Sequence, residues 1–180
     1  MKTTTLVLAL ALAVPVAAPA VAQKMGPKAP DDAAPVMVID TPTFLKMATG
    51  SDLFEIQSSQ LAKEKAESSD LKMFADMIVE DHSNAEAKLK ATLEGKGKSF
   101  SPEPPAPKQQ KMLDQLKATS GKDFDTLYLD MQAQAHMEAV ALFRTYAGSG
   151  DDVEVVGFAK ETLPRLETHL GHVKELIVSR

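Results

Sequence analysis

The sequence has 180 residues, a length that fits one domain with or without terminal tails. Hydrophobic residues make up 44% and charged residues 25%, which excludes a fully disordered chain and a protein with several membrane spans. The formal net charge of −5 argues against a nucleic-acid partner, because such proteins carry a basic face for the phosphates. The absence of cysteine excludes disulfides, thiol nucleophiles and cysteine-ligated metal sites.

The first 22 residues have the features of a secretory signal peptide. Lys2 precedes an apolar stretch that begins at Leu6 and ends in the small triplet Ala-Val-Ala at Ala22. This stretch contains two prolines and falls short of the roughly 20 apolar residues that span a bilayer. We therefore expect cleavage before Gln23, a periplasmic location, no transmembrane span in the mature chain, and no lipid anchor because no cysteine follows the cut.

Residues 23–40 predict a flexible leader, because three prolines among alanine and aspartate cannot bury enough apolar surface to offset the ordering entropy. The folded domain is predicted over 41–178, where apolar residues recur at helical spacing. This spacing predicts four long helices and one short helix, over about 42–66, 70–95, 107–119, 122–147 and 151–178.

Caps and helix breakers set the expected helix ends. Thr41 and Asp70 are the predicted N-caps of the first two long helices. Residues 99–107 read SFSPEPPAP, and their prolines exclude both a helix and a central strand, so we expect an extended crossover. Pro164 predicts a kink or a break in the last helix. The predicted fold is therefore all-α, a four-helix bundle with one long proline-rich crossover and a short extra helix.

Each long helix places one polar residue on a face that is otherwise apolar or small. Glu55, His82, His136 and His169 occupy these positions, from the first helix to the fourth. Burying an ionisable side chain is costly unless it is paired, hydrogen-bonded or bound to a metal. The four residues therefore predict a metal site inside the bundle, with nitrogen and oxygen ligands suited to zinc, iron, manganese or copper.

Two further carboxylates, Glu86 and Glu138, lie close enough in sequence to act as additional ligands or to orient the others. The alternative interpretation is that the histidines are neutral, hydrogen-bonded to carboxylates, and fix the register of the helices. Acidic residues next to His82, namely Glu80 and Asp81, are expected on a solvated face, with at most a role in orienting a metal ligand. No glycine-rich phosphate loop, nucleophile elbow or Ser-His-Asp order is present, so no catalytic residue is assigned.

Three segments carry a resemblance to a known family: LKMFADMIVEDHSNAEAKLK at 71–90, FDTLYLDMQAQAHMEAVALF at 124–143 and FAKETLPRLETHLGHVKEL at 158–176. They resemble bacterial ferritin-like proteins grouped as domain of unknown function 4142, described as periplasmic or outer-membrane proteins. The resemblance covers about residues 41–178 and implies a ferritin-like bundle. It implies no reaction, since the family has none assigned.

The chain departs from the di-iron pattern, in which Glu-x-x-His occurs on two helices. Val79, Ala133 and Leu166 stand three residues before the candidate histidines. The leading interpretation is an exported ferritin-like protein that binds a metal ion or acts in the envelope stress response. The alternatives are a metal-free structural or partner-binding envelope protein, with a homo-oligomer or an envelope protein as partner, and a redox enzyme with a non-standard histidine-rich centre.

Overall fold

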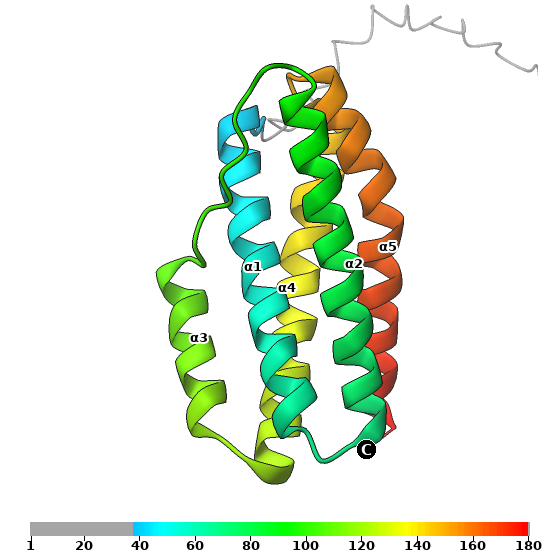
Figure 1. Ribbon diagram of the computed structural model, residues 1–180. Coiled ribbons are helices and arrows are strands. Elements are labelled where there is room, and N and C mark those ends of the chain that lie inside the picture. Colours follow the sequence, from blue (N-terminus) through cyan, green and yellow to red (C-terminus); the bar gives the residue numbers. More distant parts are fainter. Residues whose placement is uncertain (1–37, 180) are drawn as a thin grey trace, which may run out of the picture. The chain divides into compact units, whose positions relative to one another are not determined.

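The computed structural model describes residues 38–179 (Figure 1). Within them the chain forms five helices and no strand, which confirms the all-α class: α1 (Thr41–Lys65), α2 (Ser69–Glu94), α3 (Pro107–Ala118), α4 (Gly121–Ser149) and α5 (Val153–Val178). Every helix end lies within two residues of its predicted position. The predicted signal peptide and nearly all of the predicted leader lie outside the described residues.

The four long helices pack side by side around a shared core, and α3 lies outside them against α1 and α4 (Figure 1). Contacts between α1 and α2, α2 and α5, α5 and α4, and α4 and α1 close a ring of four helices. The proline-rich segment leaves the end of α2 and runs back beside α1 to α3. It is fixed there by a hydrogen bond from the Glu103 N–H to Thr49 Oγ1, 3.0 Å long. The predicted extended crossover is therefore confirmed.

The helix starts differ from the predicted caps. Asp40, not Thr41, caps α1, because its carboxylate accepts a 2.9 Å hydrogen bond from the N–H three residues later. Ser68, not Asp70, caps α2 in the same way. The Thr41 hydroxyl instead donates to Asp151 Oδ1 at 2.6 Å, which ties the start of α1 to the turn between α4 and α5. The Thr41 side chain therefore bonds to a residue far away in the sequence, although its local sequence predicted that it caps the helix.

Helix α5 continues through Pro164 without the predicted break. Proline has no N–H, so the carbonyl of Lys160 loses its helical hydrogen bond. Both residues are exposed, and water can bond that carbonyl. The helix therefore tolerates the proline on its solvent side at the cost of one backbone hydrogen bond.

The core consists of two hydrophobic clusters separated along the helices by a polar layer. The first cluster includes Phe54, Phe74, Tyr128 and Val173. The second includes Phe44, Leu89, Phe143 and Leu166. Between them lie four buried ionisable side chains, one from each long helix: Glu55, His82, His136 and His169. We call these four residues the polar layer.

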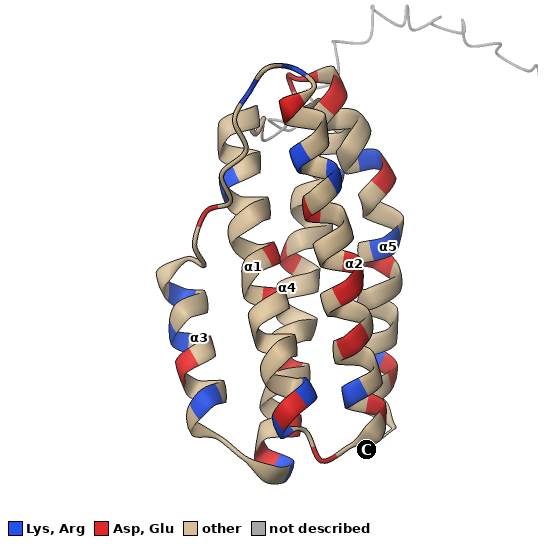
Figure 2. Cartoon of the chain, in the orientation of Figure 1, with Lys and Arg blue, Asp and Glu red and all other residues tan. Residues whose placement is uncertain are grey.

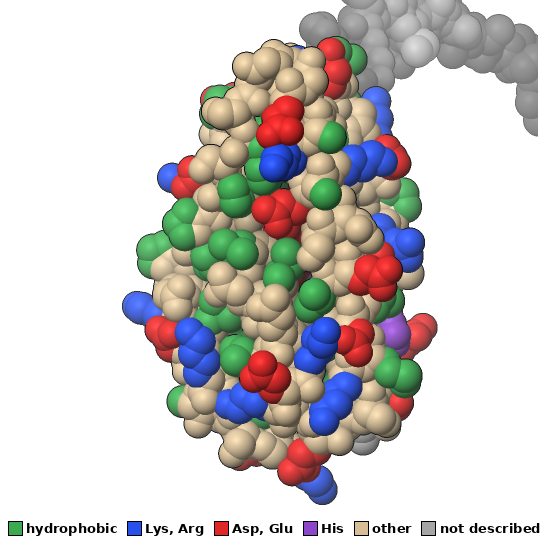
Figure 3. All heavy atoms as spheres, viewed as in Figure 1, with side chains coloured by type: hydrophobic (Ala, Val, Ile, Leu, Met, Phe, Trp, Pro, Cys, Tyr) green, Lys and Arg blue, Asp and Glu red, His purple; other side chains and the backbone are tan. Residues whose placement is uncertain are grey.

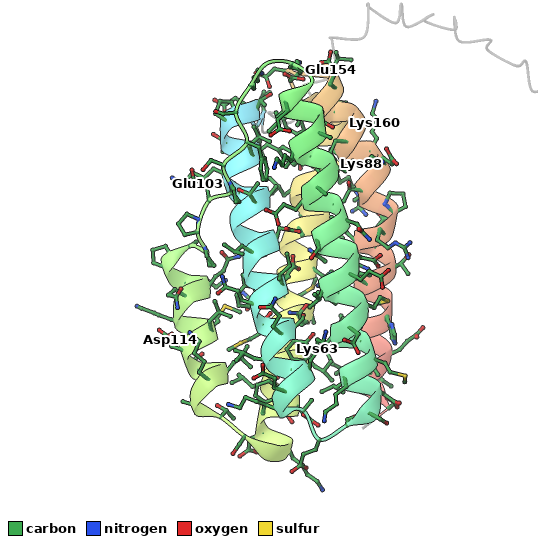
Figure 4. The ribbon with its side chains drawn as sticks, in the orientation of Figure 1. Lys63, Lys88, Glu103, Asp114, Glu154 and Lys160 are labelled. Atoms are coloured by element: carbon green, nitrogen blue, oxygen red, sulfur yellow. The ribbon has the colours of Figure 1, made fainter. Side chains whose placement is uncertain are left out.

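Basic and acidic residues are interspersed along the described helices (Figure 2). In the view of Figure 3 hydrophobic side chains are scattered among them. The labelled Lys63, Lys88 and Asp114 point outward from α1, α2 and α3 (Figure 4). The polar layer is therefore the main departure from an apolar interior and a polar exterior.

Phe44 provides a test of the second cluster. Its ring is fully buried, stacked on Tyr146 at 4.0 Å and edge-on to Phe143 at 5.0 Å. Phe44→Ala should lower the free energy of unfolding in urea by about 3–5 kcal/mol, because it leaves a cavity. Met47, on the same helix, is 52% exposed, so Met47→Ala should change stability by no more than about 0.5 kcal/mol. Equal losses would contradict this description of the core.

Candidate metal centre

Three histidines from three helices meet in the polar layer. His82 on α2, His136 on α4 and His169 on α5 are each at most 4% exposed. One ring nitrogen from each can be chosen so that all three nitrogens lie within 4.8 Å of one another. The ring centroids are 5.3–5.6 Å apart. Imidazole nitrogens gathered in this way are a donor set for zinc, copper and iron.

The hydrogen bonds of His136 define which nitrogen carries its proton. Its Nδ1 lies 3.0 Å from the backbone carbonyl of Gln132, one helical turn earlier. A carbonyl can only accept, so Nδ1 is the protonated nitrogen and Nε2 holds a free lone pair. That lone pair faces His169.

His169 is held in the complementary way. Its Nε2–H donates to Asp81 Oδ2 at 2.8 Å, which leaves a free lone pair on Nδ1. This Nδ1 lies 3.3 Å from Nε2 of His136. Two lone pairs at this distance repel unless they share a proton or a metal ion. A metal-bound histidine typically donates its other N–H to a carboxylate or a backbone carbonyl, as both of these rings do.

His82, on a third helix, is also held through one of its two ring nitrogens. Its Nδ1 lies 2.8 Å from Asp52 Oδ1 on α1. Its Nε2 is buried and has no hydrogen-bond partner within the described part of the chain. An unsatisfied buried polar atom costs about 1–3 kcal/mol, so this nitrogen calls for a ligand.

Glu55 lies beside the rings and not between them. Its Oε1 is 3.2 Å from Nδ1 of His136, the nitrogen turned away from His169, and its Oε2 is 3.5 Å from Nδ1 of His82. Because the His136 hydrogen is directed at Gln132, Oε1 receives no hydrogen bond. Burial raises the pKa of Glu55 to about 7, although His82 beside it acts in the opposite direction. The carboxylate is placed to balance positive charge beside His82 and His136.

Burial and neighbouring charges give the three histidines different pKa values. Burial lowers the pKa of His136 to about 3 and that of His169 to about 4, and the nearby His82 adds to both shifts. Burial also disfavours the charge of His82, but the Glu55 and Asp52 carboxylates raise its pKa to about 8 overall. At neutral pH, His136 and His169 are therefore in the uncharged form that binds metal ions.

The remaining predicted residues lie further out. Glu86 lines the cavity beside the layer, and burial raises its pKa. Glu138 has a side chain that is 58% exposed and accepts a hydrogen bond from Lys108 at the surface. His172 is half-buried against the Phe74 ring and lies outside the layer. The structure thus brings together Glu55 and the three histidines, places Glu86 nearby, and leaves Glu138 outside.

Two groups in the site were not identified from the sequence: Asp52 and the carbonyl of Gln132. Asp81 was expected on a solvated face with at most a role in orienting a ligand, and the structure shows it bonded to His169. Its position directly before His82 was the available signal, because adjacent residues on one helix reach two different neighbouring helices. Asp52 lies one turn before Glu55 on the same side of α1. Gln132 acts through its backbone, which residue type does not reveal.

A cavity of about 50 Å³ adjoins the layer and is lined by α1, α2, α4 and α5. His82, His169 and Glu55 form part of its wall. Five large apolar side chains also line it: Leu89, Leu142, Phe143, Phe158 and Leu166. The partly exposed Asp52, Glu86 and Arg165 also line it and reach solvent.

Comparison with known proteins assigns the chain to a family. A family model described as a domain of unknown function, DUF4142, matches residues 26–176, and the chain belongs to this family. The match includes the whole polar layer. No curated protein and no solved structure matches the chain. None of the helices within residues 38–179 is long and apolar enough to cross a membrane.

The depressed pKa of His136 predicts how stability depends on pH. In the metal-free protein its pKa is about 3 when folded and about 6.5 when unfolded, so the unfolded chain binds more protons between these values. Its contribution is fully present above pH 6.5 and falls on acidification, by up to about 1.4 kcal/mol per pH unit. Urea unfolding with chelator at pH 7, 6 and 5 should show a shallower decline for His136→Asn than for the unmodified protein.

A curve for His136→Asn that runs parallel to that of the unmodified protein over this pH range would refute a neutral buried His136.

Proposed function

We propose that this chain is an exported, periplasmic protein with a ferritin-like four-helix bundle that binds one divalent or redox metal ion through His82, His136 and His169. The observation that carries the proposal is the 3.3 Å approach of two ring nitrogens, His136 Nε2 and His169 Nδ1, whose protons lie on the opposite ring atoms. One long connection after α2 is also typical of ferritin-like folds.

A metal ion accounts for this geometry better than structural histidines do. A proton shared between His136 and His169 would satisfy two nitrogens and leave Nε2 of His82 without a partner. One ion could satisfy all three. Two nitrogens bound at about 2.05 Å and at a tetrahedral angle lie about 3.3 Å apart, which is the separation between His136 and His169.

The surrounding charge also supports a cation. Asp52 and Asp81 accept hydrogen bonds from two of the rings, and Glu55 lies beside two of them. These carboxylates would offset the charge of a divalent ion in a site of low polarity. Three imidazole nitrogens favour zinc or copper, accommodate iron, and suit manganese least.

The small number of carboxylates in the polar layer argues for a single ion. Di-iron sites in ferritin-like proteins take glutamates from four helices, whereas this layer contains one glutamate, Glu55. We therefore propose a mononuclear site and assign no ferroxidase reaction to it.

Elemental analysis tests the proposal. Protein purified from the periplasm without a histidine tag should carry close to one equivalent of metal per chain. His82→Ala and His169→Ala should retain less than a tenth of it, while His172→Ala should keep the full amount. Protein that is isolated without metal and takes up no added zinc, iron, manganese or copper would refute the proposal.

Asp81 tests whether the orienting groups matter. Asp81→Asn keeps the shape of the side chain but weakens the acceptor for His169 Nε2–H, so metal affinity should fall about 10–100-fold. Competition with a coloured chelator measures this change. The neighbouring Glu80 is exposed, and Glu80→Gln should leave affinity unchanged. Equal affinities for both variants would show that Asp81 does not orient the ligand.

A further inference from the structure

We infer that a metal ion bound by the three histidines would have one coordination position open toward the adjoining cavity. This position would take a small neutral ligand that has one donor atom and an apolar body. This inference rests on the proposed metal site and adds to it the class of molecule that the site would bind.

The first step is the placement of the cavity. His82 and His169 line it, whereas His136 lies behind them in the core. An ion held by the three rings would therefore have the cavity on one side. Zinc sites with a purely structural role are closed by four protein ligands, whereas reactive sites use three and leave a position open.

The second step is the placement of the carboxylates that contact the rings. Asp52 is engaged with Nδ1 of His82, and Asp81 is engaged with Nε2 of His169 and lies 3.6 Å from Arg165. Glu55 lies beside the Nδ1 atoms of His82 and His136, on the side of His136 that faces away from His169. These three carboxylates therefore contact the ring nitrogens that would not hold the ion, and the fourth ligand would come from the cavity, whose wall also includes Glu86.

The third step is the character of the walls. Two phenylalanines and three leucines face the same cavity as the two histidines, so the ligand meets its donor site at one end and an apolar surface elsewhere. Asp52, Glu55, Asp81 and Glu86 on the polar side disfavour an anion. At about 50 Å³ the cavity admits only a small ligand.

Cobalt substitution provides the test. The full chain is loaded with Co²⁺, whose visible absorption reports its ligands, and is titrated at pH 8 with imidazole or azide. Imidazole is neutral with an apolar ring, and azide is an anion without an apolar body. We expect a saturable spectral change with imidazole, at a dissociation constant at least tenfold below that of azide, with Co²⁺ retained after gel filtration.

Variants that fill the cavity provide a second test of the inference. Ala139→Leu on α4 adds bulk inside the cavity and should weaken imidazole binding at least tenfold while Co²⁺ binding persists. Ala85→Val, at a partly exposed position on α2, does the same with less strain if Ala139→Leu does not fold. Ala141→Leu, on the exposed side of α4, is the control and should bind imidazole as the unmodified protein does.

The outcomes separate the two proposals. Co²⁺ uptake with no response to either ligand would overturn the open position and leave the metal site standing. Equal affinity for azide and imidazole, or imidazole binding unaffected by a filled cavity, would overturn the selection for an apolar ligand. Failure to take up Co²⁺, seen before any ligand is added, would overturn both.

Discussion

The hydrogen bonds that hold the buried imidazoles constrain the rest of the structure. Asp52 on α1 holds His82 on α2, and Asp81 on α2 holds His169 on α5. Glu55 on α1 lies against His136 on α4. Sliding one helix by a single turn, about 5.4 Å, would bring these ionisable groups against leucine and phenylalanine. The polar layer therefore fixes the register of all four long helices, whatever else it binds.

This constraint divides the apolar interior. Because the layer interrupts the core, each hydrophobic cluster must be stable with only its own contacts. Aromatic rings supply much of this packing: Phe74 and Tyr128 meet in one cluster, and Phe44 and Tyr146 stack in the other. A chain under selection for stability alone could replace the layer with leucine, since apolar residues of similar volume often stabilise such positions. Four ionisable residues at these positions therefore cost stability relative to an apolar layer, which is consistent with the proposed metal site.

Most of what could be predicted followed from the spacing of apolar residues along the sequence. The helices and the inward direction of Glu55 and the histidines follow from apolar spacing, which reports the buried face of a helix. It does not report which neighbouring helix a flanking residue will meet. For this reason the partner of Asp81, at the edge of the apolar face of α2, could not be predicted, although the side chain binds His169 on α5. Thr41 was assigned to a cap for a similar reason, because its partner lies 110 residues away.

The proline in α5 has a consequence for motion. The hydrogen bond missing at Lys160 lies between Phe158 and Thr162, which both line the cavity. Bending α5 at this level therefore breaks one fewer backbone bond than bending it elsewhere. Amide hydrogens in this stretch should exchange with solvent faster than those near His169, where the Asp81 hydrogen bond ties the helix to α2. The stretch of α5 that is easier to bend and the residue held by Asp81 thus lie about two turns apart on one helix.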